Sequence, residues 1–133
     1  MTVVIDASAA IEIALDKDCA GQFQEIIKEA DVVLAPDTFP AEVTNVFWKY
    51  AHFSGFPIDK CQGGISFCLD LVDDYVNVRH LCHEAFPESV RYKHSAYDIF
   101  YLIVARRNDA LILTKDRGMI GTAVRSGVKV AET

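Results

Sequence analysis

The segment Val3-Val4-Ile5-Asp6-Ala7-Ser8 gives the clearest indication of the fold, because it joins a short apolar run directly to a carboxylate. Continuous runs of β-branched residues are typical of strands that are buried on both faces of a parallel sheet. Val32-Val33-Leu34 is a second such run, and Ile112-Leu113-Thr114-Lys115-Asp116 again passes from apolar residues to an acid. The pattern predicts an α/β protein with polar side chains at the ends of its strands.

Strand-like runs alternate with helical patterns along the chain, which predicts an α/β sandwich around a mostly parallel sheet. The expected strands are Val3–Ile5, Val32–Ala35, Tyr75–Val78, Leu111–Thr114 and Val128–Val130. The expected helices are roughly Ala9–Leu15, Ala20–Ala30, Pro40–Phe53, Pro57–Asp73, His80–Phe86, Ala96–Asn108 and Met119–Ser126. Gly63-Gly64 is expected to bend or break the fourth helix. The helix Ala96–Asn108 is apolar nearly all round, so we expect it to be buried.

Length and composition favour a single cytosolic domain covering residues 1–133. The hydrophobic content of 51% and the charged content of 24% are ordinary for a globular protein. No basic residue precedes the first apolar run, so the N-terminus does not resemble a secretion signal. The longest apolar run, Ile99 to Ala105, is too short to span a bilayer, and no membrane association is expected.

The four cysteines do not form a CxxC pair, and we expect reduced thiols rather than disulfides. A zinc site built from His80, Cys82 and His83 is the alternative, although a second ligand pair with zinc-like spacing is missing from the sequence.

The charge is distributed unevenly. Residues 1–90 contain five Lys/Arg and 15 Asp/Glu, whereas residues 91–133 contain eight Lys/Arg and four Asp/Glu, within a total charge of −6. The basic C-terminal third could contact phosphates while metal ions neutralise an acidic site, or its charges could simply keep the surface solvated. The basic candidates for contact with a nucleic-acid backbone are Arg91, Lys93, Arg106, Arg107, Lys115 and Arg117.

Four acids are expected to meet at one edge of the sheet. Asp6 and Asp116 follow strand-like runs, and ligands of open α/β sheets bind beyond the carboxyl ends of the strands. Glu42 and Asp98 lie in the first turns of helices that begin at that same edge. Each acid also has a purely structural interpretation, as a helix cap, as a capping-box partner of Ser95, or as a favourable charge at a helix N-terminus.

Taken together, the four acids predict a divalent metal site. Asp98 projects from an otherwise apolar helix face, where an uncompensated carboxylate is costly. Clustered, desolvated acids should have raised pKa values without metal, and carboxylate oxygens suit Mg²⁺ or Mn²⁺. Such ions can activate water and stabilise charge on a phosphodiester. Ser8 and Thr114, two residues from Asp6 and Asp116, could orient the ligands.

The chain resembles the PIN-domain ribonucleases and, more narrowly, the toxin subunit of VapBC toxin–antitoxin pairs. The resemblance extends from Val3 to about Val130 and rests on four short motifs in order. These motifs are Asp6-Ala7-Ser8 after an apolar strand, Pro40-Ala41-Glu42-Val43, Tyr97-Asp98-Ile99 opening an apolar helix, and Thr114-Lys115-Asp116.

This resemblance implies a three-layer α/β/α fold and metal-dependent endonucleolytic cleavage of RNA. Asp6, Glu42, Asp98 and Asp116 would coordinate Mg²⁺ or Mn²⁺, with Ser8 and Thr114 supporting them. A small antitoxin protein would occupy a groove near the active site, and the domain would often form a homodimer.

Three further expectations concern single residues and one helix face. Val43, Val46, Phe47, Tyr50 and Phe53 form an apolar stripe that favours a core position, with an antitoxin or dimer surface as the alternative. Trp48 is expected in the core or at an interface. His94 is expected on the surface, and the alternative is that it approaches the site near Asp98.

Two other classes of function compete with a nuclease. The domain could bind metal, RNA or a partner subunit without cleaving, although the set of four acids favours catalysis. It could also be an aspartate phosphotransfer domain. Domains of that class typically carry paired acids after their first strand, whereas Ala7 and Ser8 follow Asp6 here.

Overall fold

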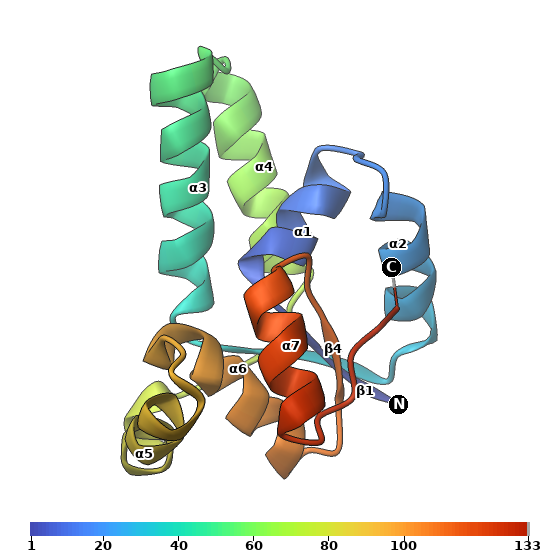
Figure 1. Ribbon diagram of the computed structural model, residues 1–133. Helices are drawn as coiled ribbons and strands as arrows, with labels where there is room; N and C mark the ends of the chain where they lie inside the picture. Colours follow the sequence, from blue (N-terminus) through green and yellow to red (C-terminus); the bar gives the residue numbers. More distant parts are fainter. Residues whose placement is uncertain (133) are drawn as a thin grey trace.

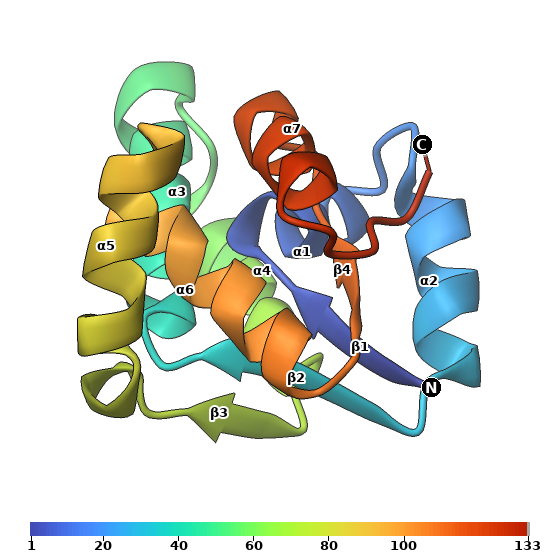
Figure 2. The same cartoon turned by 60° about the horizontal axis from the view of Figure 1, so that its bottom comes forward.

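A four-stranded, entirely parallel sheet in the order β3-β2-β1-β4 forms the centre of the computed structural model, which describes residues 1–132 (Figures 1 and 2). Its strands are β1 (Thr2–Ile5), β2 (Val32–Pro36), β3 (Asp74–Val76) and β4 (Leu111–Leu113). The prediction of an α/β fold around a parallel sheet is confirmed, and four of the five expected strands are present.

The central strand β1 is the most buried part of the sheet. Val3, Val4 and Ile5 are fully buried, as the β-branched run predicted. Val4 pairs with Leu34 of β2 on one side and with Ile112 of β4 on the other. Strands β2 and β3 lie on one side of β1, and β4 lies on the other side, so the strand order reverses at β1. Ligands of open α/β sheets bind at the carboxyl ends of the strands where such a reversal occurs, which here is between β1 and β4.

Helices cover both faces of the sheet and make three layers (Figure 2). The helices are α1 (Ala7–Ala14), α2 (Ala20–Glu29), α3 (Phe39–Ser54), α4 (Ile58–Asp70), α5 (Cys82–Tyr92), α6 (Ala96–Arg107) and α7 (Arg117–Arg125), with a 3₁₀ turn η1 at Val78–His80. Helix α6 crosses one face beside α5 and α7, whereas α1 and α4 pack behind the sheet. The expected burial of α6 is confirmed, because Ile99 and every residue from Tyr101 to Ala105 are buried.

The expected strand at Val128–Val130 is wrong. Val130 makes only an isolated parallel bridge with Ile112. The chain turns at Gly127, whose φ is 78°, and the Val128 amide then donates to the Ala123 carbonyl at 2.9 Å, closing the end of α7. The backbone of this segment therefore completes the end of α7 before it meets the sheet edge, where it makes a single bridge in place of a strand.

The glycine pair Gly63-Gly64 does not break α4, contrary to expectation. The helix continues from Ile58 to Asp70, and α3 and α4 form a hairpin that projects from the sheet (Figure 1). A Cβ at Gly64 would lie 2.6 Å from Cε1 of Phe47, whose side chain is only 1% exposed. Gly64 is therefore needed for the close approach of the two helices.

We expect Gly64→Ala to lower the free energy of unfolding by about 1–3 kcal/mol, because the new methyl group overpacks against the buried ring of Phe47. Gly63→Ala is the matched control. A Cβ there meets no described atom within 4 Å, so this change should raise the free energy of unfolding by up to about 1 kcal/mol through helix propensity. Urea unfolding of both variants measures the difference. Equal effects would contradict the packing explanation.

The apolar stripe of α3 is only partly core. Val43 and Phe47 are buried, but Phe53 is 72% exposed, so the core position favoured for Phe53 is wrong. Trp48 is 54% exposed, which excludes the core for it and leaves the expected interface position as a prediction. Trp48 and Phe53 lie in the C-terminal half of α3, which is part of the hairpin that projects from the sheet. Within residues 1–132, no helix is long and apolar enough to cross a membrane.

Candidate active site

The four acids singled out in the sequence line one open pocket of about 260 Å³. Asp6 follows β1, Glu42 lies in the first turn of α3, Asp98 lies in the first turn of α6, and Asp116 precedes α7. The remaining lining residues are Ala7, Ser8, Asn45, Val46, Tyr101 and Met119. Parallel strands place their carboxyl ends at one edge, so Asp6 and Asp116, which are 110 positions apart in the chain, meet there.

Asp6 is the most deeply placed of these acids, with only 4% of its surface exposed. Its Oδ1 accepts hydrogen bonds from the Ser8 hydroxyl at 2.7 Å and from the Ala9 amide at 2.9 Å. Its Oδ2 accepts from the Thr114 hydroxyl. Burial raises the pKa of the Asp6 carboxyl to about 6, with a smaller contribution from the charge of Asp98, and the hydrogen bonds oppose this rise.

Ser8 and Thr114 also fasten the loop after β4 to Asp6. The Ser8 hydroxyl accepts from the Lys115 amide at 2.8 Å, and the Thr114 hydroxyl accepts from the Asp116 amide at 3.0 Å. Thr114 is fully buried. The two hydroxyls therefore set the orientation of Asp6 and the position of Asp116 at the same time.

Helix capping accounts for part of what Asp6 and Asp116 do. Asp6 caps α1 through Ala9, and Asp116 caps α7 by accepting from the Met119 amide at 2.9 Å on Oδ1. Each cap uses one oxygen of the carboxylate. The capping and site interpretations are thus compatible, since both residues also line the pocket.

Glu42 receives a hydrogen bond from Tyr101, a residue that the sequence patterns did not single out. The Tyr101 hydroxyl lies 2.5 Å from Glu42 Oε2, and the Tyr101 side chain is 1% exposed. Burial raises the pKa of Glu42, and the nearby charge of Asp98 raises it further. Burial and Glu42 also raise the pKa of Tyr101, which remains a donor. The available signal was spacing, because Tyr101 lies three residues after Asp98 and shares its helix face.

His94 is not the surface residue that the sequence suggested. Its side chain is 15% exposed, and its Nε2 lies 2.6 Å from Asp98 Oδ2. Its Nδ1 lies 3.0 Å from the hydroxyl of Thr122 on α7. His94 therefore joins the start of α6 to α7 and fixes the position of the Asp98 carboxylate.

The capping residue of α6 is Ser95, whose hydroxyl accepts from the Tyr97 amide at 3.3 Å.

The charge of the pocket is one-sided. Four carboxylates line it, and none of the described residues lining it is Lys, Arg or His. Burial raises the pKa values of Asp6 and Glu42, and the nearby charge of Asp98 raises both further by repulsion. Hard divalent cations would remove that repulsion, so the donor set fits Mg²⁺ or Mn²⁺.

The four acidic side chains of the pocket do not converge on one point where a single ion could contact three of them. Within residues 1–132, no group of three His, Cys, Asp or Glu side chains is arranged to hold a metal directly. The acids point toward their own partners, as Glu42 does toward Tyr101 and Asp98 toward His94. Mg²⁺ commonly keeps several waters and uses only one or two carboxylates as direct ligands, so an open acidic pocket remains compatible with it.

The suggested zinc ligands His80, Cys82 and His83 do not form such a group either. All three are exposed, and the Cys82 thiol donates to the Val78 carbonyl at 3.2 Å. The expectation of free thiols is confirmed for all four cysteines: Cys19, Cys61, Cys68 and Cys82.

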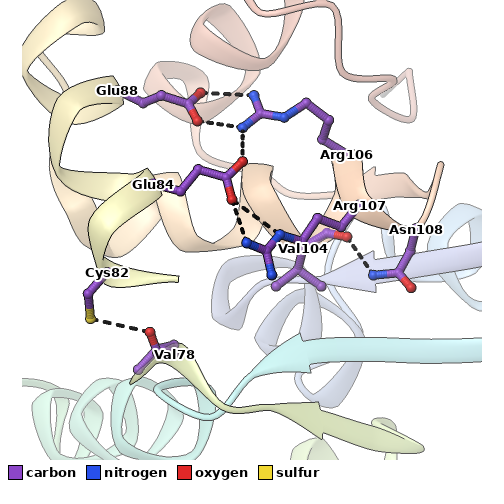
Figure 3. A network of polar contacts seen from close by, with 8 residues as sticks. All are labelled: Val78, Cys82, Glu84, Glu88, Val104, Arg106, Arg107 and Asn108. Carbon is purple, nitrogen blue, oxygen red and sulfur yellow. Dashed lines mark hydrogen bonds and ion pairs between the residues drawn. The ribbon is translucent and has the colours of Figure 1, made fainter. Parts of the chain in front are cut away.

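Two of the basic residues proposed for contact with RNA have another role. Arg106 donates to Glu88 Oε1 at 2.9 Å and to Glu84 Oε1 at 2.8 Å, and Arg107 donates to Glu84 Oε2 at 2.8 Å (Figure 3). Glu84 and Glu88 belong to α5, so this network fastens α5 to the C-terminal end of α6, whereas Asp98 lies at the opposite end of that helix.

The fold has a counterpart among solved structures. The crystal structure of PAE2754 from Pyrobaculum aerophilum matches 92% of this chain, and 87% of its own chain is covered, with a TM-score of 0.67 and 19% sequence identity. At this identity the likeness establishes the fold alone. No protein-family model matches the chain, and no curated protein matches its sequence. The chain therefore has a three-layer α/β/α fold with a parallel central sheet.

Proposed function

We propose that this protein is a metal-dependent endoribonuclease of the PIN-domain type, acting as the toxin of a VapBC-like toxin–antitoxin pair. One observation carries the proposal: four carboxylates from four separate chain segments line one pocket that has no cationic side chain among its described lining residues. Gathering four carboxylates in one pocket, with Asp6 buried and Glu42 and Asp98 half-buried, is costly for a fold unless the site binds cations.

In this proposal Asp6, Glu42, Asp98 and Asp116 hold Mg²⁺ or Mn²⁺. When bound, such an ion would supply Lewis-acid activation of water and would neutralise charge on the phosphodiester. Ser8 and Thr114 fix the Asp6 carboxylate, and Tyr101 fixes Glu42. The protein's own contribution is thus a set of oriented carboxylates in a pocket that opens to solvent.

The proposed partners follow from the resemblance to the VapBC toxins, which rests on the four sequence motifs. RNA would be the substrate, a small antitoxin protein would cover the groove near the acids, and the active form would be a cytoplasmic homodimer. The phosphotransfer alternative is less well supported, because both oxygens of the buried Asp6 carboxylate already accept hydrogen bonds.

The proposal is tested by incubating the purified protein with total cellular RNA, and separately with single-stranded DNA, in Mn²⁺, Mg²⁺ or EDTA. We expect discrete RNA fragments in Mn²⁺ or Mg²⁺ and none in EDTA. Folded, antitoxin-free protein that leaves RNA intact at every metal concentration would contradict the proposal and favour a binding module.

His94→Ala is expected to raise the Mn²⁺ concentration needed for half-maximal cleavage by about tenfold or more, because residues that orient metal ligands typically affect metal affinity by about 10–100-fold. The control is His83→Ala, since His83 is exposed. His94→Gln, which can keep one hydrogen bond to Asp98, should recover part of the affinity. Cleavage rates across a Mn²⁺ titration provide the measurement, and an unchanged midpoint in His94→Ala would show that His94 is only structural.

A further inference from the structure

A second pocket of about 310 Å³ adjoins the acidic one. The two pockets share Ser8 and Val46 in their walls, so they are neighbouring parts of one surface depression. The other residues that line the second pocket are Ile11, Glu12, Lys17, Tyr50 and Lys115. Ser8 and Lys115 belong to two of the four sequence motifs, but the proposed metal site assigns no role to Lys17, Tyr50 or Lys115.

Two lysine ammonium groups line the second pocket and give it positive charge. Lys17 comes from the loop after α1, and Lys115 from the loop after β4. Among residues 1–132, neither lysine forms an ion pair, in contrast to Lys28, which pairs with Glu25, and Lys129, which pairs with Asp109.

The positions of both lysines are set by the surrounding structure. Lys17 Nζ donates to the Tyr50 hydroxyl at 2.8 Å, and Lys115 Nζ lies 3.4 Å from Cys19 Sγ. The backbone amide of Lys115 donates to Ser8, the residue that also orients Asp6. The cationic pocket is therefore fastened directly to the acidic one.

Glu12 is the one carboxylate among the described residues lining this pocket. It is 8% exposed, and its Oε2 accepts from the Cys19 amide at 2.9 Å. Its charge offsets one of the two lysines, so the lining keeps a net positive charge beside a pocket of four acids.

Tyr50 adds an aromatic surface. Its ring lies 5.1 Å from the ring of Phe56 and 6.2 Å from the ring of Phe47, in tilted arrangements that hold it in place. Lys17 Nζ is 5.4 Å from the centre of the Tyr50 ring. A fixed aromatic ring beside ammonium groups is the combination that proteins use to bind single-stranded nucleic acids, through base stacking and phosphate contacts.

We propose that this second pocket binds the nucleotide adjacent to the scissile phosphate of a single-stranded RNA, with Lys17 and Lys115 at its phosphate and Tyr50 against its base. The inference rests on the proposed nuclease function and specifies how its substrate is held. An RNA strand would pass from the acidic pocket across Ser8 and Val46 to the lysine pair.

The test compares Lys17→Ala/Lys115→Ala with Lys28→Ala/Lys129→Ala, which removes the same charge elsewhere on the surface. The KM for a labelled RNA should rise at least about tenfold in the first variant, with a smaller change in kcat, and should stay near the wild-type value in the second. The slope of log KM against log salt concentration should also fall by about 0.7 for each phosphate that the lysines no longer neutralise. Thermal unfolding of both variants verifies that each is folded.

The interaction of Tyr50 with a base has its own test. An abasic substitution at one nucleotide flanking the cleavage site should raise KM for the wild type but not for Tyr50→Leu. The proposal would be overturned if the two double lysine variants had equal KM values. It would also be overturned if the abasic substitution raised KM as much for Tyr50→Leu as for the wild type.

Failure of this inference can be separated from failure of the nuclease function by measuring RNA binding in the Asp6→Asn background, using fluorescence anisotropy in Mg²⁺. If the wild type cleaves RNA but replacing the two lysines has no effect, only the proposed nucleotide-binding pocket is rejected. If the protein does not cleave RNA but binds it in a way that depends on the two lysines, only the proposed nuclease function is rejected. Binding of a poly-glutamate peptide that is abolished in Lys17→Ala/Lys115→Ala, with RNA binding unchanged, would reassign the pocket to an acidic protein segment and overturn the proposal.

Discussion

Asp6→Asn is expected to reduce metal-dependent RNA cleavage by at least about a thousandfold. Asp6 is the most buried of the four acids, and an amide cannot supply the negative charge that a metal ligand needs at this position. The size follows from treating the acids as a unit, in which removal of one member abolishes most of the catalysis.

The fold should survive this substitution. Asn is as good a helix cap as Asp, so the amide oxygen can keep the hydrogen bonds from Ser8 and the Ala9 amide. The amide NH₂ can donate to Thr114, whose hydroxyl then turns toward Ser8, 3.3 Å away. Asp59→Asn, in the exposed first turn of α4, is the control and should cleave like the wild type. An Asp6→Asn variant with full activity would show that the active site lies elsewhere.

In the absence of metal, Asp6→Asn should be more stable than the wild type at neutral pH, by up to about 3 kcal/mol. Burial raises the pKa of Asp6 from 3.8 to about 6, so the folded protein holds this proton more tightly than the unfolded chain does. Protonated Asp6 therefore contributes stability to the folded wild type, fully below about pH 4, and this contribution is lost as pH rises through about 6. Each pKa unit corresponds to about 1.4 kcal/mol, and Asp6→Asn avoids this loss because its amide does not ionise.

Urea unfolding in EDTA at pH 4 and pH 7.5 measures this difference. The two proteins should have similar free energies of unfolding at pH 4 and diverge by pH 7.5, and Asp59→Asn should show no such divergence. Saturating Mn²⁺ should stabilise the wild type more than Asp6→Asn, because a ligand that binds the folded state raises its stability. A wild type that is the more stable protein at pH 7.5 in EDTA would contradict the electrostatic explanation of the pocket.

The sheet and the meeting of the four acids could be anticipated because both depend on backbone topology. The apolar runs before Asp6 and Asp116 marked buried parallel strands, and the carboxyl ends of such strands share one edge. The prediction of a strand at Val128–Val130 was wrong because the Val128 amide donates to the Ala123 carbonyl and closes the end of α7. Hydrophobic periodicity does not reveal such a local hydrogen bond.

The partners of the acids were harder to predict, because they depend on side-chain packing. Tyr101 resembles one more apolar residue of α6, and only the approach of α3 brings Glu42 to its hydroxyl. His94 depends on Thr122 of α7 for its position. The second pocket joins Lys17, Tyr50 and Lys115 from three separate segments, and its formation depends on how those segments pack.

The most direct test of the central claim is the initial rate of cleavage of one 5′-labelled RNA across a Mn²⁺ titration, measured for the wild type and for Asp6→Asn, Glu42→Gln, Asp98→Asn and Asp116→Asn. We predict a rate that rises with Mn²⁺ to saturation, vanishes in EDTA and is abolished or severely reduced in all four variants. Cleavage that persists in EDTA, or that is unchanged when the acids are replaced, would contradict the assignment of these four carboxylates as the metal site of a nuclease.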